Sequence, residues 1–307
     1  MSDHGHSHDH SSAVDDALAA SNEGIRALKL SLAGLGVTAL LQTVIVVISG
    51  SVALLADTIH NFGDALTAIP LGIAFVIGKR SPTKRYTYGF GRAEDLAGVA
   101  IVVMIALSAV VAAYEAIDRL LDPRDVTHVP WVAAAGVIGF AGNELVATYR
   151  IRVGRRIGSA ALVADGMHAR TDGLTSLAVV AGAIGSAVGW QLADPIVGLV
   201  ITVAILGIVR HAARDIYRRL MDAVDPALVD EAAHVLGHVD GIEAVDRVRI
   251  RWIGHELHAE IDLAADAALS LADAHAIARA AEHELVHEIP RLAGATIHVN
   301  PSGEGHH

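Results

Sequence analysis

Two segments of the sequence carry the same arrangement of histidine and aspartate. Residues 56–66 and residues 164–174 both read A-D-x-x-H-x-x-x-D-x-L, and a threonine follows each copy. The His and the second Asp are four residues apart, which puts both side chains on one face of an α-helix because 3.6 residues make a turn. Two such helices side by side would bring two imidazoles and two carboxylates to one point, a donor set that suits four-coordinate Zn²⁺. The four candidate ligands are His60, Asp64, His168 and Asp172.

The composition is that of a membrane protein. Of the 307 residues, 53% are hydrophobic and only 19% are charged, and the mean hydropathy is +0.46. Cysteine is absent. A metal must therefore be held by histidine and carboxylate, which disfavours a Cu(I) carrier. The formal net charge of −11 disfavours nucleic acid as a partner, because nucleic-acid binding needs a basic surface.

Six apolar segments predict six transmembrane helices, since a span needs about 20 residues. The duplicated motif lies in the second and the fifth segment. The loops after the second, fourth and sixth segments are rich in Lys and Arg, whereas the turns after the first and fifth carry none. The positive-inside rule makes the basic loops cytoplasmic and predicts that both termini are cytoplasmic, in a multi-pass protein of the cell inner (plasma) membrane. The segments cover roughly residues 25–48, 52–77, 96–121, 129–149, 159–188 and 195–209.

The first aspartate of each motif copy, Asp57 or Asp165, lies three residues before the candidate histidine ligand and on nearly the same helix face. These carboxylates could orient the imidazoles, line a water path or make ordinary helix contacts. Ionisable groups inside a membrane helix are costly, so we predict a role in supporting the metal ligands or in the ion pathway.

The two ends of the chain differ from its centre. Residues 1–24 are polar and His-rich, which predicts a disordered tail, and the six-helix domain is expected over residues 25–220. From residue 221 to 303 the patterns follow the order helix, strand, strand, helix, strand, and Ser270 followed by Asp273 is typical of a helix start. This order predicts a small α/β ferredoxin-like (αββαβ) domain on the cytoplasmic side. The elements are expected at residues 227–239, 245–252, 257–263, 270–288 and 295–299.

With these features the chain resembles the cation diffusion facilitator family, in particular its zinc-type members. The two H-x-x-x-D helices fall in the second and fifth spans, as the family places them. Residues 88–94 (Y-G-F-G-R-A-E) and 193–198 (A-D-P-I-V-G) resemble the family's entries to the third and sixth spans, and residues 295–301 (A-T-I-H-V-N-P) resemble its closing strand. Together these features cover nearly the whole chain.

The resemblance implies a homodimer in the lipid bilayer that exports divalent metal from the cytoplasm, driven by inward flow of protons and without an organic cofactor. It assigns the four candidate ligands to the transport site, in the pattern usually associated with zinc over cadmium. It also implies a cytoplasmic metal-binding site where Zn²⁺ is regulatory, with ligands at His258, His275 and His298. Metal and protons would compete for the same imidazole and carboxylate atoms, which is the basis of an antiporter.

Other functions remain open at the level of sequence. The exported ion could be Fe²⁺, Mn²⁺, Co²⁺, Ni²⁺ or Cd²⁺, because ligand type alone does not separate these ions from Zn²⁺. A protein of another class, a cytoplasmic metal sensor or scaffold, would have no need for charged residues within its spans. The segment from His283 to His287 fits the zinc-peptidase pattern H-E-x-x-H with Glu284 as base, but a domain of this size has little room for a cleft. We therefore expect no enzymatic activity.

Overall fold

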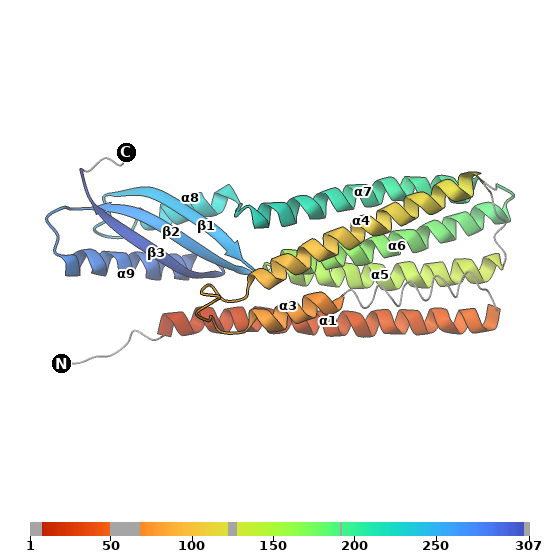
Figure 1. Cartoon of the computed structure of the whole chain (residues 1–307), viewed down its shortest axis with the longest axis horizontal. Coiled ribbons are helices and arrows are strands. Elements are labelled where there is room, and N and C mark those ends of the chain that lie inside the picture. The colour runs from red at the N-terminus through yellow and green to blue at the C-terminus, as the bar shows by residue number, and fades with distance from the viewer. Residues whose placement is uncertain (1–7, 50–67, 122–127, 191, 304–307) are drawn as a thin grey trace. The chain divides into compact units, whose positions relative to one another are not determined.

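The structure is a computed structural model that describes residues 8–49, 68–121, 128–190 and 192–303 (Figure 1). It divides into two compact units. The larger unit comprises Glu23–Ile216 and contains the apolar helices. The smaller unit comprises Tyr217–His307 together with the N-terminal residues up to Asn22, and it contains the sheet.

The described helices of the larger unit match the apolar segments of the sequence. Four of them are long and apolar enough to cross a membrane, while α6 is equally long but carries ionisable residues, and α3 is short. The fold class is confirmed: a helical transmembrane domain is followed by an α/β domain. The predicted span at residues 52–77 coincides with described structure only over α3, and its first part lies outside the described residues. The helices are α1 (His8–Ser49), α3 (Ala68–Gly78), α4 (Arg92–Leu121), α5 (Val129–Ile157), α6 (Ala160–Ala187) and α7 (Ala193–Leu220).

Helices α1, α5 and α7 each extend eight residues or more beyond their predicted ends. Helix α1 begins at His8, so residues 8–24, where disorder is expected, are helical. Four of the eight residues from Ala13 to Ala20 are alanine, the strongest helix former. Helices α5 and α7 continue past the expected ends at residues 149 and 209 to Ile157 and Leu220. Arginine is also a good helix former, so the basic segments that the positive-inside rule treats as loops continue the helices.

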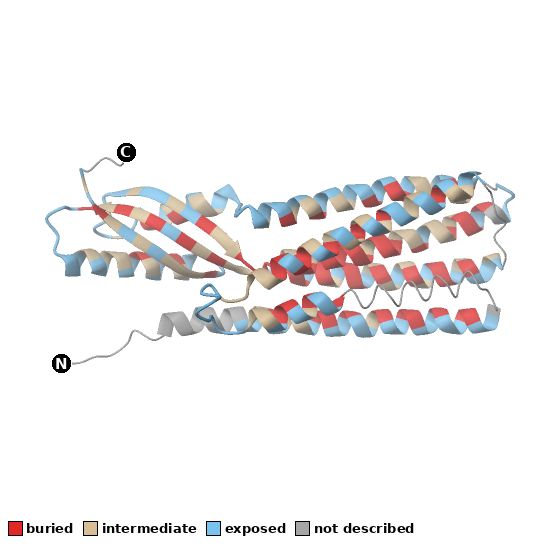
Figure 2. Cartoon of the chain, in the orientation of Figure 1, coloured by how far each residue is buried: buried red, intermediate tan, exposed pale blue. Residues whose placement is uncertain are grey.

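Helices α5 and α6 form an antiparallel hairpin with direct backbone contact. The turn between them is made by Gly158, whose φ of 76° is left-handed and whose N–H donates to the carbonyl of Gly154. A Cβ atom added to Gly154 would lie 2.9 Å from the backbone nitrogen of Val163. Figure 2 shows buried residues in red along α6, nearly without interruption over its first half. The hairpin is therefore the centre of this unit.

The smaller unit has the predicted αββαβ order. Its sheet has the order β1-β2-β3, with β1 antiparallel to β2 and β2 parallel to β3. Alternate β2 residues from Leu257 to Leu263 are buried against core residues of both helices, among them Leu236 and Leu285. The side chain of Ser270 accepts a hydrogen bond from the N–H of Asp273 and caps the second helix, as predicted. The elements are α8 (Pro226–Leu236), β1 (Ala244–Ile253), β2 (Glu256–Ala265), α9 (Leu271–Glu288) and β3 (Leu292–Pro301).

The last turn of α7 is attached to this sheet. The guanidinium of Arg219 lies 3.9 Å from the ring centroid of Trp252 and donates a hydrogen bond of 2.8 Å to the carbonyl of Gly254. A cation over an indole face is stabilised by the ring quadrupole. Arg219, Trp252 and Gly254 all belong to the smaller unit, so these contacts fix the turn between β1 and β2 within that unit.

Candidate metal site

Helix α6 places His168 and Asp172 together in a buried position. They are 2% and 6% exposed, and the imidazole Nδ1 lies 3.7 Å from a carboxylate oxygen of Asp172. Within the described part of the chain, neither ring nitrogen of His168 has a hydrogen-bond partner. A buried polar atom without a partner costs free energy, and a metal ion bound at the imidazole would remove that cost. The pair therefore offers one nitrogen and one oxygen ligand from a single helix face.

The other predicted half of the site lies outside the described residues. His60 and Asp64, together with Asp57, fall within residues 50–67. Their approach to His168 and Asp172 stays a prediction.

Two threonines of α6 support the backbone at the candidate ligands. The hydroxyl of Thr171 donates to the carbonyl of His168 at 2.6 Å, and the hydroxyl of Thr175 donates to the carbonyl of Asp172 at 2.7 Å. Such back-bonded hydroxyls satisfy themselves inside an apolar helix and bend it slightly. Thr175 is the threonine that directly follows the second motif copy. The sequence pattern includes this threonine, but its hydrogen bond to the backbone is seen only in the structure.

Asp165 is fully buried and is paired with Arg150, which comes directly after the predicted end of the fourth span at residue 149. The guanidinium Nη1 of Arg150 lies 2.9 Å from a carboxylate oxygen of Asp165, and the two side chains are 2% and 0% exposed. The expectation that the fourth helix ends at residue 149 and leaves Arg150 in a loop is wrong, because α5 continues to Ile157 and this residue is buried within it. The signal in the sequence was the helical spacing Asn143, Ala147, Arg150, Gly154, which forms one buried face.

A second charge pair joins the same two helices. The guanidinium of Arg170 in α6 makes two hydrogen bonds, of 2.6 and 3.0 Å, to the carboxylate of Glu144 in α5. These side chains are 38% and 36% exposed, so this pair lies at the surface of the hairpin. In one pair the arginine comes from α5 and in the other it comes from α6.

The H-x-x-x-D spacing also occurs in α7, where it does not form a comparable site. The Nε2 of His211 lies 3.5 Å from a carboxylate oxygen of Asp215, but the two side chains are 60% and 40% exposed. Water can satisfy exposed groups, so nothing in this geometry requires a metal. Burial, and not spacing, distinguishes the pair in α6.

The predicted cytoplasmic ligands lie on three different elements. His258 in β2 is opposite Gly294 of β3, while His298 is opposite Asp262, four residues further along the same pair of strands. At about 3.3 Å per residue this separates the two histidines by about 13 Å along the sheet. His275 is exposed on α9. Among the described residues, no three His, Asp or Glu side chains form a group that could hold a metal.

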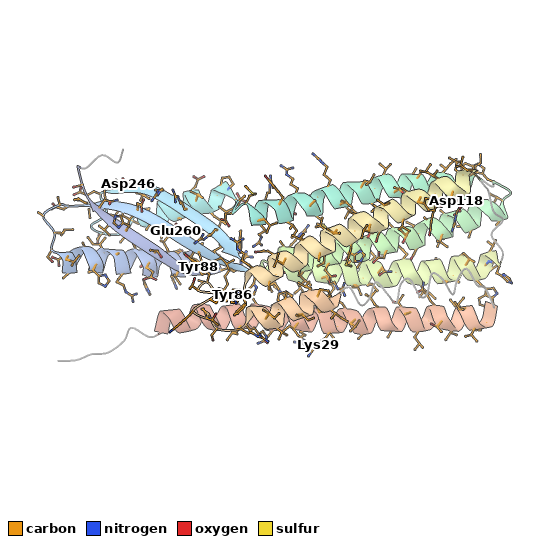
Figure 3. All side chains as sticks on the ribbon, in the orientation of Figure 1. Lys29, Tyr86, Tyr88, Asp118, Asp246 and Glu260 are labelled. Carbon is orange, nitrogen blue, oxygen red and sulfur yellow. The ribbon has the colours of Figure 1, made fainter. Side chains whose placement is uncertain are left out.

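The sheet face that carries His258 is crossed by ion pairs. The guanidinium of Arg247 lies 2.5 Å from a carboxylate oxygen of Asp262, and that of Arg251 lies 2.9 Å from Glu260. Figure 3 labels Glu260 in β2 and Asp246 in β1. The carboxylates of Asp262 and Glu260 are thus engaged by arginine in this chain.

The H-E-x-x-H segment is on the surface of α9. His283 and His287 are both exposed, and their ring planes are nearly parallel, with centroids 6.4 Å apart. Glu284 is exposed as well. Within the described chain no third ligand completes a metal group around them, so the pattern lacks the three protein ligands of a catalytic zinc site.

Fold and site together define a multi-pass membrane protein with a buried imidazole–carboxylate pair and a C-terminal α/β domain. Two family descriptions match the chain: "Cation efflux transmembrane domain" over residues 28–221, and "Cation efflux protein, cytoplasmic domain" over residues 224–302. The chain therefore belongs to the cation efflux (cation diffusion facilitator) family. It is a divalent-cation efflux transporter with a cytoplasmic C-terminal domain, and it is not an enzyme. The type of cytoplasmic domain implies dimerisation.

Individual relatives agree on the family and differ in their names. A probable cation efflux system protein of Mycobacterium tuberculosis is 62% identical over 300 residues, which cover 98% of this chain and 90% of the relative. The manganese efflux system protein MneP of Bacillus subtilis is 28% identical, over 83% of this chain and 88% of the relative. The magnetosome protein MamB of a Magnetospira species is 26% identical, over 83% and 87%.

Proposed function

We propose that this chain exports Zn²⁺ from the cytoplasm across the cell inner membrane in exchange for protons, as a homodimer. The observation that supports it best is the buried pair His168 and Asp172, whose imidazole lacks a partner among the described residues. His60 and Asp64 would supply the same two ligand types from the second span, so that four groups surround the ion. Both termini would be cytoplasmic, and Asp57 and Asp165 would support the ligands.

The donor types favour zinc over manganese. Imidazole suits Zn²⁺, whereas Mn²⁺ prefers carboxylate, carbonyl and water oxygens. Manganese is nevertheless the second candidate, because a relative is named a manganese efflux system protein. Direct competition between the two ions for transport separates these alternatives.

Proton coupling follows from the chemistry of the same groups. A histidine changes its charge near neutral pH, and the cationic form would repel a divalent ion and could not donate its nitrogen lone pair. If His60 and His168 take up protons on the outer side and lose them to the cytoplasm, metal leaves as protons enter. Asp64 and Asp172 would then hold the metal.

The proposal also assigns a role to each segment of the chain and to the histidines of the cytoplasmic domain. Residues 1–24 would form the N-terminal arm, residues 25–220 the transport domain and residues 221–303 the regulatory domain. His258 and His298 are too far apart along one sheet to share one ion. A regulatory zinc ion that binds both of these histidines would need one from each protomer of the dimer. We propose the same arrangement for a zinc ion that uses His275.

The test is uptake of Zn²⁺ into inside-out vesicles that contain the purified protein and carry a pH gradient. Asp172→Ala should abolish the gradient-dependent uptake. Asp215→Ala is the matched control, because it removes an aspartate at the same spacing from a histidine in an exposed pair. Mn²⁺ is offered in the same assay, alone and in competition.

Three outcomes would change the assignment. Equal uptake by the wild type and the Asp172 variant would mean that this pair is not the transport site. Preferential uptake of Mn²⁺ would replace zinc by manganese as the cargo. No uptake of either ion, with zinc still bound by the cytoplasmic domain, would favour a metal sensor.

A further inference from the structure

The Arg150–Asp165 pair is the most deeply buried charge pair among the described residues. Its two side chains are 2% and 0% exposed, and its members come from α5 and α6. An isolated charge in a membrane helix is expensive, and a buried ion pair stabilises a fold no better than a well-packed apolar pair. The need for a charge pair at this point is therefore not explained by stability.

Asp165 lies on the same face of α6 as the candidate metal ligands. It precedes His168 by three residues and Asp172 by seven, so the three side chains project within about 60° of one another around the helix. As described, Asp165, His168 and Asp172 do not form a group that could hold a metal, and a third metal-binding group would be added to this face only if the carboxylate of Asp165 turned towards the two ligands. Its charge is instead met by the guanidinium of Arg150.

The packing on both sides of the pair keeps Arg150 in place. A Cβ atom added to Gly154, one turn after Arg150, would lie 2.9 Å from the backbone of Val163. A Cβ atom added to Gly166, next to Asp165, would lie 3.0 Å from the backbone of Ile151. The helix backbones therefore touch on either side of the pair, and the long arginine side chain is enclosed between them.

We propose that Arg150 is a positioning residue of the transport site: it binds Asp165 and withholds this carboxylate from the metal. The inference rests on the proposed transport function. The ion then meets one imidazole and one carboxylate from α6, which are donor types suited to zinc. Once Arg150 is replaced, the released carboxylate adds oxygen donors beside His168, and harder ions such as Mn²⁺ gain relative to Zn²⁺.

The test is a double-mutant cycle on the full-length protein in lipid nanodiscs, with the dissociation constants of Zn²⁺ and Mn²⁺ measured by calorimetry. Arg150→Met should shift the ratio of the two constants towards Mn²⁺ by about 10-fold, the scale on which supporting partners act at metal sites. Arg150→Met combined with Asp165→Asn should restore the wild-type ratio, because the released carboxylate is gone. Arg170→Met is the matched control, since it breaks the exposed charge pair between the same two helices.

A purely structural pair would lower the melting temperature in Arg150→Met and leave the ratio unchanged, and that result overturns the proposal. If Arg150→Met does not fold, Asp165→Asn carries the test. It leaves a cation one turn from His168, so both ions should bind about 10-fold more weakly, with recovery in the double variant. Unchanged affinities in Asp165→Asn would again refute the role. The proposed function fails separately, if wild-type binding does not depend on Asp172.

Discussion

Gly166 offers a sharp test of how tightly α6 must sit against α5. A Cβ atom at this position would lie 3.0 Å from the backbone nitrogen of Ile151 and 3.1 Å from the carbonyl oxygen of Ala147. Neither atom can rotate away, because both belong to the backbone of α5. Ordinary contact distances are about 3.5 Å or more, so Gly166→Ala should displace α6 by about 0.5 Å.

The displacement has two measurable consequences. Overpacking of this kind typically costs about 1–3 kcal/mol, which should appear as a lower melting temperature of the protein in nanodiscs. His168 follows Gly166 by two residues and moves with it. Metal ligands must be held within about 0.5 Å of their productive geometry, so a displacement of this size should weaken zinc binding about 10-fold. Gly166→Val should be worse on both measures.

Gly36→Ala in α1 is the matched control. A Cβ atom there meets nothing within 4 Å, and alanine is the better helix former by about 1 kcal/mol. Its stability should be unchanged or slightly higher, with wild-type zinc affinity. If Gly166→Ala behaves like Gly36→Ala in both measurements, the close packing of α5 and α6 does not position the candidate ligands.

Four further substitutions, one of them a control, test the rest of the fold by thermal and chemical unfolding of the full chain. Leu285→Ala should destabilise the cytoplasmic domain by about 2–5 kcal/mol because the side chain is fully buried, whereas the exposed Leu271→Ala should have almost no effect. Ser270→Ala should cost about 1 kcal/mol through loss of the helix cap. Arg119→Met removes a 2.8 Å ion pair with Asp194 that is partly exposed, so it should cost at most about 1 kcal/mol. A large loss in this last variant would show that the pair is more than a surface contact.

Much of the architecture follows from local patterns. Alternation from Leu257 to Leu263 places β2 with one face buried, and Ser270 marks the start of α9, because strand pleating and helix capping act over a few residues. The apolar runs likewise place the long membrane helices. Helix ends were predicted less well. Helix α5 continues through its arginine-rich segment as far as Ile157, because arginine is a good helix former and a basic segment does not by itself end a helix.

The sequence by itself determined the chemistry of the candidate site. The pattern around His168 and Asp172 specifies the donor types and puts them on one helix face, because the spacing of a helix is a local property. Among the described helices, only the tertiary structure decided which H-x-x-x-D pair is withdrawn from water: the pair in α6 is enclosed, while His211 in α7 is exposed. Tertiary structure alone also joined Arg150 to Asp165. Burial and ion pairing depend on which helix lies alongside, and no local pattern encodes that neighbour.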